Sequence, residues 1–318
     1  MLALGDGSYA KLWGRRPRYA SVDRRGHVYE QVELGARKPS DVRAFACWRQ
    51  GRTGAAWTEY RGDGVYALRV ALRPDGARTA DVVRSMDDDA GVGDVALAFR
   101  PDGTLVVVYS VFHEVRAVTM TEDSELSEPV TLGPASERTE LQAEIARSGR
   151  TVVAWTTIDA GEERNERRRI YAVTGRDGAF GPPQLVDRAR HLNISASTQV
   201  PIRLAVASNG RAALLWGTDR QDSDADSFTG TYLVRTAEAA PNGTFGRSRT
   251  LATAGLPGDI GVRPSGVFFA LWTTANGLRA STGHGTERVA EGRTPDVRVS
   301  FRRGKPRVEW RGGVATRR

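Results

Sequence analysis

The side chains most often used for hydrolysis or metal binding are scattered in this sequence. The four histidines, His27, His113, His191 and His284, lie at least 78 residues apart, so no two have the spacing of metal ligands. The single cysteine, Cys47, excludes an internal disulfide and a cysteine metal cluster. The chain also lacks a nucleophile elbow, an HExxH helix, a P-loop and a dinucleotide fingerprint. We therefore predict no cofactor, no metal and no catalytic residue.

One acidic stretch has part of the pattern of a calcium loop. Asp222, Asp224 and Asp226 alternate as the first carboxylates of such a loop do. The sixth position is Ser227 instead of glycine, and Leu233 occupies the twelfth position, where a glutamate closes a calcium site. We interpret this stretch as an acidic loop.

Glycoside hydrolysis needs two carboxyl groups that face each other across a sugar ring. Four acidic residues, Glu59, Asp159, Glu162 and Asp219, each follow a tryptophan by a few positions. If the segments around them are equivalent structural units, these carboxylates share one rim of the fold. Loops at such a rim are polar in any case, so the pattern leaves a hydrolase as an alternative only.

A phrase repeated along the chain defines those structural units. A glycine is followed six positions later by a large aromatic residue, with mostly apolar residues between them, as in residues 210–216, GRAALLW. The phrase occurs seven times, and its aromatic residues are Trp13, Trp57, Tyr109, Trp155, Trp216, Trp272 and Trp310. A constant phrase with variable gaps indicates one supersecondary unit repeated with insertions in its loops.

Each unit has the pattern of antiparallel β-strands. An alternating or apolar run, such as residues 95–99, precedes a polar turn with glycine, which is typical hairpin chemistry. The phrase itself is almost wholly apolar, as expected for a strand buried on both faces. A third run follows, as at residues 232–235, and a glycine turn leads to a fourth in several units. Four antiparallel strands per unit predict a β-propeller blade.

We therefore predict an all-β protein, a single β-propeller of four-stranded blades over residues 1–318. Seven blades fit the seven phrases, and six is the alternative if one terminal unit is an appendage. The expected blades are residues 1–38, 39–90, 91–138, 139–192, 193–256, 257–293 and 294–318, the last of them incomplete. The seven aromatic residues are interpreted as structural, filling the space between neighbouring blades.

The positive charge of the chain is concentrated at its two ends. The net charge is +8, and 43 of the 46 basic residues are arginine. Residues 1–38 carry +4 and residues 298–318 carry +7. Closure of a ring brings the first and last blades together, which predicts a basic patch for an anionic partner. Its candidate binding residues are Arg15, Arg16, Arg18, Arg302, Arg303 and Arg317.

The units resemble the tandem repeats of bacterial, chiefly actinobacterial, sialidase-like propeller proteins, most of which have no known function. The likeness is carried by Asn209-Gly210 before Trp216, Ser148-Gly149 before Trp155, and residues 178–182, GAFGP, and it covers nearly the whole chain. It implies a propeller fold and export to the cell envelope or beyond. Sialidases add Ser-x-Asp-x-Gly-x-x-Trp boxes, an arginine triad and a tyrosine nucleophile, and this chain has no such box.

The leading functional hypothesis is a non-enzymatic module that binds a protein or an anionic polysaccharide. The alternative is a sialidase-like hydrolase or lyase with its site at the mouth of the propeller channel. Nucleic acid is disfavoured as a partner because aromatic residues do not alternate with the basic residues at the ends. We expect a monomer without a transmembrane segment. The N-terminus lacks the features of a signal peptide, which leaves the cytoplasm as the alternative location.

Overall fold

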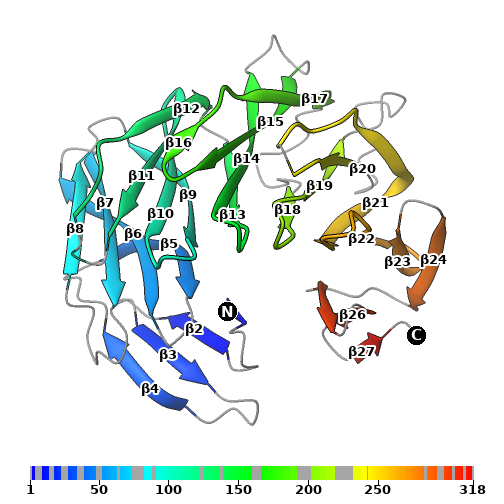
Figure 1. Ribbon diagram of the computed structural model, residues 1–318, viewed down its shortest axis with the longest axis horizontal. Helices are drawn as coiled ribbons and strands as arrows, with labels where there is room; N and C mark the ends of the chain where they lie inside the picture. The colour runs from blue at the N-terminus through cyan, green and yellow to red at the C-terminus, as the bar shows by residue number, and fades with distance from the viewer. Residues whose placement is uncertain are drawn as a thin grey trace. The chain divides into compact units, whose positions relative to one another are not determined.

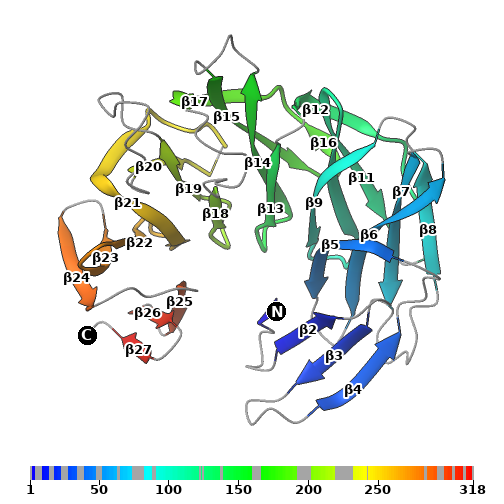
Figure 2. The ribbon, with the colours of Figure 1, turned by 180° about the vertical axis from the view of Figure 1, so that it is seen from behind.

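The structure is a computed structural model that covers the chain from residue 1 to residue 318. It describes residues 2–3, 9–13, 18–22, 28–33, 39–47, 52–62, 65–73, 82–87, 91–121, 123, 125–136, 139–159, 166–191, 202–218, 232–241, 243–282, 285–291, 297–302, 305–310 and 313–316. The described residues form β-strands and turns without a helix, and every strand pair is antiparallel (Figures 1 and 2). The all-β antiparallel class predicted from the sequence is confirmed.

Residues 1–143 form the first of two compact units. Three sheets of four strands each follow one another in this unit, and in each sheet the strands are adjacent in chain order. The first sheet consists of β1 (Leu2–Ala3), β2 (Tyr9–Trp13), β3 (Arg18–Val22) and β4 (Val28–Glu33). The second consists of β5 (Pro39–Cys47), β6 (Thr53–Gly62), β7 (Val65–Arg73) and β8 (Val82–Asp87). The third consists of β9 (Val92–Phe99), β10 (Leu105–Val111), β11 (Glu114–Met120) and β12 (Val130–Pro134).

Residues 144–318 form the second unit, and the strand that leads into it begins at residue 140. One sheet contains β13 (Glu140–Ile145), β14 (Arg150–Asp159), β15 (Glu166–Arg176), β16 (Ala179–Phe180) and β17 (Gln184–His191). A seven-stranded sheet contains β18 (Arg203–Val206), β19 (Ala212–Thr218), β20 (Tyr232–Ala239), β21 (Arg249–Val262), β22 (Phe268–Thr274), β23 (Gly277–Ser281) and β24 (Thr286–Ala290). The last sheet has β25 (Arg298–Arg302), β26 (Lys305–Trp310) and β27 (Gly313–Thr316).

Strand β21 takes part in two four-stranded arrangements, which explains the seven-stranded sheet. Its first half pairs with β20, from Thr236 opposite Arg249 to Tyr232 opposite Gly255. Its second half pairs with β22, from Leu256 to Val262, with a register shift next to Pro257. The strand therefore ends one arrangement and begins the next, and both of its ends lie beside hairpin turns.

The turns that precede the apolar phrase share one backbone geometry. In four of them, at residues 100–104, 146–150, 207–211 and 263–267, the glycine N–H donates to the carbonyl three residues earlier. The glycine has a φ between 81° and 92° in all four, a conformation that side chains with a Cβ adopt only at a cost. Serine, asparagine, aspartate and proline in the other positions favour the turn. Local sequence therefore determines where each hairpin reverses.

The registers reveal a second repeated feature next to five of the seven phrases. The recurrent aromatic residue lies directly opposite an arginine of the following strand in five sheets or half-sheets. These pairs are Trp13 with Arg18, Trp57 with Arg69, Tyr109 with Arg116, Trp216 with Arg235 and Trp272 with Arg279. The exceptions are Trp155, which lies opposite Tyr171 and stacks on it with ring centroids 5.5 Å apart, and Trp310, opposite Gly313. Five of the arginines therefore lie within strand pairs, directly opposite a recurrent aromatic residue.

The hydrophobic core lies between consecutive sheets. Alternate residues of the buried strand β19 show this clearly, because successive side chains point to opposite faces of a sheet. Leu214 and Trp216 pack with Ile170 of the preceding sheet. Ala213 and Leu215 pack with residues of β21 and β22. Strand β19 is therefore held by apolar contacts on both of its faces.

Candidate functional site

The basic residues predicted as a binding patch fall largely outside the described part of the chain. Arg18 lies in β3 and Arg302 ends β25, and the structure describes the backbone of both but not their side chains. Arg15, Arg16, Arg303 and Arg317 lie outside the described residues. The patch and its anionic partner stay predictions.

The structure describes no side chain of the four acidic residues predicted to share one rim. Glu59 lies in β6 and Asp159 ends β14, again without described side chains. Glu162, Asp219 and the Asp222–Asp226 stretch lie outside the described residues. Within the described residues, no three His, Cys, Asp or Glu side chains are grouped so as to hold a metal ion.

The recurrent aromatic residues are buried wherever their side chains are described. Trp57, Trp155, Trp216 and Trp272 are at most 1% exposed, and Tyr109 is 2% exposed. Trp310 is partly buried against the core between β22, β23 and the last sheet. The side chain of Trp13 is not described. None of the five fully buried rings offers a face to a ligand.

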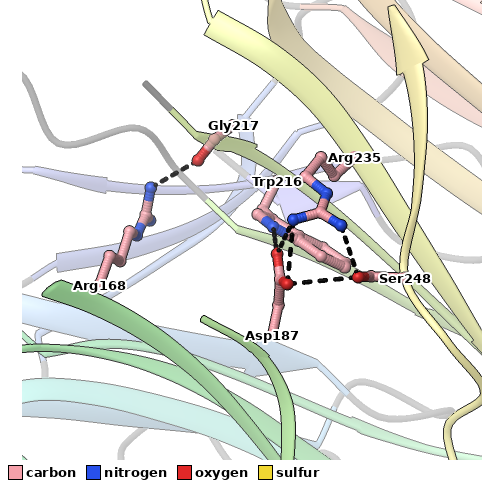
Figure 3. A network of polar contacts seen from close by, with 6 residues as sticks. All are labelled: Arg168, Asp187, Trp216, Gly217, Arg235 and Ser248. Carbon is pink, nitrogen blue, oxygen red and sulfur yellow. Dashed lines mark hydrogen bonds and ion pairs between the residues drawn. The ribbon is translucent and has the colours of Figure 1, made fainter. Parts of the chain in front are cut away.

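A polar network joins two consecutive sheets around one of these tryptophans (Figure 3). Asp187 of β17 accepts hydrogen bonds from the indole Nε1 of Trp216, at 3.0 Å, and from Nη1 of Arg235, at 2.8 Å. Ser248 donates to the same carboxylate at 3.2 Å and accepts from Arg235 Nη2 at 2.7 Å. Beside the network, Arg168 of β15 donates to the carbonyl of Gly217 in β19 at 3.0 Å. The carboxylate of Asp187 is saturated by donors and ties the sheets together.

A second set of carboxylates connects the first strands of neighbouring sheets. Asp94 of β9 accepts from the backbone N–H of Leu141 in β13, at 2.8 Å. Within the second unit, Glu144 of β13 accepts from Val206 N–H in β18, at 2.8 Å. Asp259 of β21 accepts from Val299 N–H in β25, at 2.7 Å. First strands therefore lie next to first strands, and each carboxylate satisfies an edge N–H of the following sheet.

Two of these carboxyl groups are shifted toward the protonated form. Burial raises the pKa of Glu144 to about 7, and the negative charge of Asp259 adds to the shift. Glu144 is an exposed residue by its accessible surface, so water reaches the carboxyl group from one side. Burial also raises the pKa of Asp259, against the hydrogen bond from Val299 and the positive charge of Arg203.

At the hairpin turns, arginine side chains connect one repeat unit to the next. The residue after the phrase glycine is an arginine in three units, and each reaches the phrase glycine of the following unit. Arg52 donates to the carbonyl of Gly103 at 3.3 Å. A Cβ on Gly210 would come within 2.8 Å of Arg150 Cδ, and a Cβ on Gly266 within 3.0 Å of Arg211 Nη1. Glycine at these positions makes room for the neighbouring arginine.

The hairpin turns of the second unit lie side by side along one edge of its sheets. Ser148 N–H donates to Ser208 O at 3.2 Å, and the Asn209 side chain donates to Pro264 O at 2.8 Å. Six arginines border these turns: Arg147, Arg150, Arg176, Arg211, Arg247 and Arg263, which we call the arginine edge. None of the six forms an ion pair with any residue that the structure describes. Glu238, an acidic residue at the same edge, pairs with Arg249 at 2.8 Å.

The arginine edge contains an open cleft with a cavity volume of about 360 Å³. Its walls are formed by Arg150, Thr174, Gly175, Arg176, Ala179 and Pro241. Arg150 begins β14 and Arg176 ends β15, and the two are directly opposite in the strand register. The pKa of Arg150 is lowered, first by burial and second by the positive charge of Arg176. Two like charges thus face one cleft.

Sequence reasoning missed the arginine edge. Each of the six arginines stands beside a turn glycine or at the end of a strand, but so do many other residues in the chain. The spacing of the phrase glycines was available as a signal, because it places Arg52, Arg150 and Arg211 at the same position of their units. What the sequence does not show is which of them lacks a carboxylate partner.

No protein-family model matches this chain, and no curated protein matches it either. The fold is shared with Hsv2 of Kluyveromyces lactis, at 9% identity over 98% of this chain and 88% of that one, with a TM-score of 0.52. Hadza microbial sialidase Hz136 aligns at 12% identity over 93% of this chain and 71% of that one, with a TM-score of 0.48. An α-L-arabinanase of Penicillium chrysogenum aligns at 13% over 84% and 87%, with a TM-score of 0.44. Structural neighbours of this kind are β-propeller proteins, and identities this low bear on the fold alone.

The predicted β-propeller class agrees with the fold shared with Hsv2. Among the described residues, no helix is long and apolar enough to cross a membrane.

Proposed function

We propose that this protein is a non-enzymatic β-propeller module that binds an anionic polysaccharide along the arginine edge. The observation that carries the proposal is the set of six arginines beside adjacent turns without an ion pair to a described residue. Arg147, Arg176 and Arg247 are exposed, so their guanidinium groups are within reach of a ligand in solution.

The chemistry of the edge fits a chain of repeated negative charges. Guanidinium groups bind carboxylates and sulfates through paired N–H donors, and a row of them attracts a polyanion more strongly than an isolated charge does. The turns that carry the row are joined by hydrogen bonds between them, from Ser148 to Ser208 and from Asn209 to Pro264. A rigid row limits the conformational entropy lost when a ligand binds.

The placement of the described carboxylates supports a binding role over catalysis. Asp94 and Asp187 accept hydrogen bonds that join one sheet to the next. Neither of these two carboxylates stands free in a pocket for acid–base work.

The test is binding to heparin and to a neutral dextran of similar length, measured by calorimetry. The double variant Arg147→Ser/Arg247→Ser should weaken heparin binding by about tenfold or more, since each lost charge-assisted contact contributes on the order of 1 kcal/mol. The affinity of the parent should fall with added salt, and dextran should not bind.

A matched control removes the same charge away from the edge. Arg188 and Arg288 are exposed residues of the outer strands β17 and β24, and the double variant Arg188→Ser/Arg288→Ser should retain heparin binding. An equal loss in both double variants would reduce the effect to net charge and contradict the proposal. Binding of an acidic protein without any polysaccharide binding would assign the edge to a protein partner instead.

A hydrolase stays the second candidate because of one observation. Glu144 and Asp259 are two carboxyl groups whose charges interact, and Glu144 holds its proton to about pH 7. A proton donor and a carboxylate are the groups that glycoside hydrolysis uses. Turnover of a fluorogenic glycoside by the parent but not by Glu144→Gln would favour this candidate. Equal rates in both proteins would dismiss it.

We further propose seven blades and a closed ring, with β21 contributing to two blades and β25–β27 as a three-stranded last blade. Closure would place the basic ends together as a second anionic surface, and the molecule would be a monomer. An experimental structure with β25–β27 packed against β1–β4 would support closure, and separated sheets would contradict it. Heparin binding that is unchanged in Arg302→Ser/Arg303→Ser would exclude a role for the basic ends. The bacterial origin and export implied by the sequence resemblance stay predictions.

A further inference from the structure

One arginine in the cleft of the arginine edge, Arg150, combines burial with a lack of close hydrogen-bond partners. Arg150 is only 9% exposed, yet the one hydrogen bond from its side chain to a described residue is a long one, from Nη2 to Thr174 Oγ1 at 3.5 Å. No nitrogen of its guanidinium is among the buried side-chain nitrogens that lack a hydrogen-bond partner, so its free N–H groups face the open cleft. Most of the N–H groups of Arg150 therefore have no protein acceptor among the described residues.

The position of Arg150 is held by neighbouring glycine turns, and no acidic residue of the described part of the chain forms an ion pair with it. Its methylene stem lies against Gly210, where an added Cβ would come within 2.8 Å of Cδ. Its guanidinium lies beside Gly243, where an added Cβ would overlap both Nη2 and Thr174 Oγ1. Two glycine turns thus leave a slot for this side chain, which is oriented before any ligand arrives.

Arg176 brings a second positive charge to the same place. It lies opposite Arg150 in the register, and like charges at directly opposed positions destabilise a sheet. Asp177 follows Arg176 in the turn, and among the described residues no ion pair joins the two. An anion between the guanidinium groups would remove the repulsion and supply the missing acceptors.

We infer that this cleft is a subsite for one anionic sugar unit, with Arg150, Arg176 and Thr174 around its oxyanion group. This inference rests on the proposed function, which names an anionic polysaccharide as the ligand. It adds the place on the protein where a single charged sugar of that polysaccharide binds.

The walls and the size of the cleft point to a sugar unit instead of a free inorganic anion. Pro241, Ala179 and Gly175 contribute apolar surface to the walls, which suits the C–H face of a pyranose ring. A volume of about 360 Å³ falls within the range of small-molecule sites and far exceeds the space that an inorganic sulfate fills. The shared chemistry of the ligand is an oxyanion on a ring, either a sulfate ester or a uronic carboxylate.

The experiment uses the full chain and four probes: glucose 6-sulfate, glucuronate, glucose and inorganic sulfate. Binding is measured by calorimetry or by ligand-observed NMR at constant ionic strength. A charged sugar should bind at least tenfold more tightly than glucose and than inorganic sulfate. Preference between glucose 6-sulfate and glucuronate identifies the source of the oxyanion.

Three variants locate the binding. Arg176→Ser should reduce binding of the preferred charged sugar at least tenfold, and because Arg176 is exposed the fold should be unaffected. Arg150→Lys keeps a charge in the slot but loses the planar fork, so it should weaken binding while heat stability shows that the protein is folded. Arg188→Ser, an exposed residue of β17 away from the arginine edge, should leave binding of the single sugar unchanged.

The outcomes separate this inference from the proposed function. One outcome would overturn the subsite and leave the proposed function standing. In that outcome, heparin binding depends on Arg147 and Arg247, but Arg176→Ser changes neither heparin binding nor charged-sugar binding. Charged-sugar binding that depends on Arg176 without any heparin binding would support the subsite and overturn the polysaccharide. Equal affinity for inorganic sulfate and glucose 6-sulfate would overturn the sugar unit.

Discussion

The indole N–H of Trp216 donates to the carboxylate of Asp187 at 3.0 Å, and these two residues belong to different sheets. The tryptophan is the aromatic residue of its repeat, and the aspartate lies on the last strand of the preceding repeat. This hydrogen bond therefore connects the recurrent aromatic residue of one repeat to an aspartate of the repeat before it.

Removing Asp187 should weaken the junction strongly. Its side chain is 8% exposed and that of Arg235 is 22% exposed, so loss of the carboxylate leaves partly buried donors unpaired. We expect Asp187→Asn to lower the free energy of unfolding by about 2–4 kcal/mol in urea denaturation. The control Glu238→Gln disrupts the exposed pair with Arg249 and should cost about 0.5 kcal/mol or less. Equal costs would mean that the network adds nothing to the junction.

The buried tryptophans should dominate stability according to their burial. Trp216 has no exposed surface and packs against residues of the preceding sheet, so Trp216→Ala leaves a large cavity. We expect a loss of about 3–5 kcal/mol, measured from the urea midpoint. Trp310 is only partly buried, and Trp310→Ala should cost less. A Trp216→Ala protein that unfolds like the parent would contradict the packing described here.

Alanine substitutions at two phrase glycines distinguish the cost of an unfavourable backbone conformation from the cost of a steric contact. Gly149 and Gly210 have φ values of 81° and 89°, so alanine at either is strained by on the order of 1–2 kcal/mol. An added Cβ meets nothing within 4 Å at Gly149 but meets Arg150 Cδ at 2.8 Å at Gly210. Gly210→Ala should therefore be the more destabilising variant in thermal unfolding, by on the order of 1 kcal/mol or more. Equal melting temperatures would show that the arginine stem is free to move.

Glu144 should make the protein less stable as the pH rises. The folded carboxyl group keeps its proton to about pH 7, while in the unfolded chain its pKa returns to about 4.5. Between these values the folded state binds more protons, so the free energy of unfolding falls from pH 4.5 to pH 7 and levels off above. Water reaches the exposed side of the group, which limits the contribution to about 1 kcal/mol.

The measurement is urea denaturation of the parent and of Glu144→Gln at pH 5 and pH 8. The glutamine keeps an acceptor for Val206 N–H, so the variant should lose less stability than the parent between the two values. Glu114→Gln serves as the control, because the hydrogen bond from Arg116 lowers the pKa of that exposed carboxylate. A parent whose stability is flat over this interval would contradict the raised pKa.

The strands and their turns were predictable because they depend on local chemistry. Alternation of apolar and polar residues places strands, and a glycine after Asn209 or after Ser148 places the hairpin reversals at residues 210 and 149. The double use of β21 was not predictable, since residues 249–262 form one continuous strand whose two halves have different partners. Sequence patterns show that a strand forms and do not show which neighbours it pairs with.

The candidate site divides in the same way. The sequence by itself determined that the protein is all-β, repeated and rich in arginine, because periodicity and composition act along the chain. Only the tertiary structure decided that Arg150 lies between Gly210 and Gly243 and faces Arg176 without an ion pair to any described carboxylate. The physical reason is that a charge is neutralised by whatever lies within a few ångströms in space. That distance is settled only when sheets far apart in the sequence pack against each other.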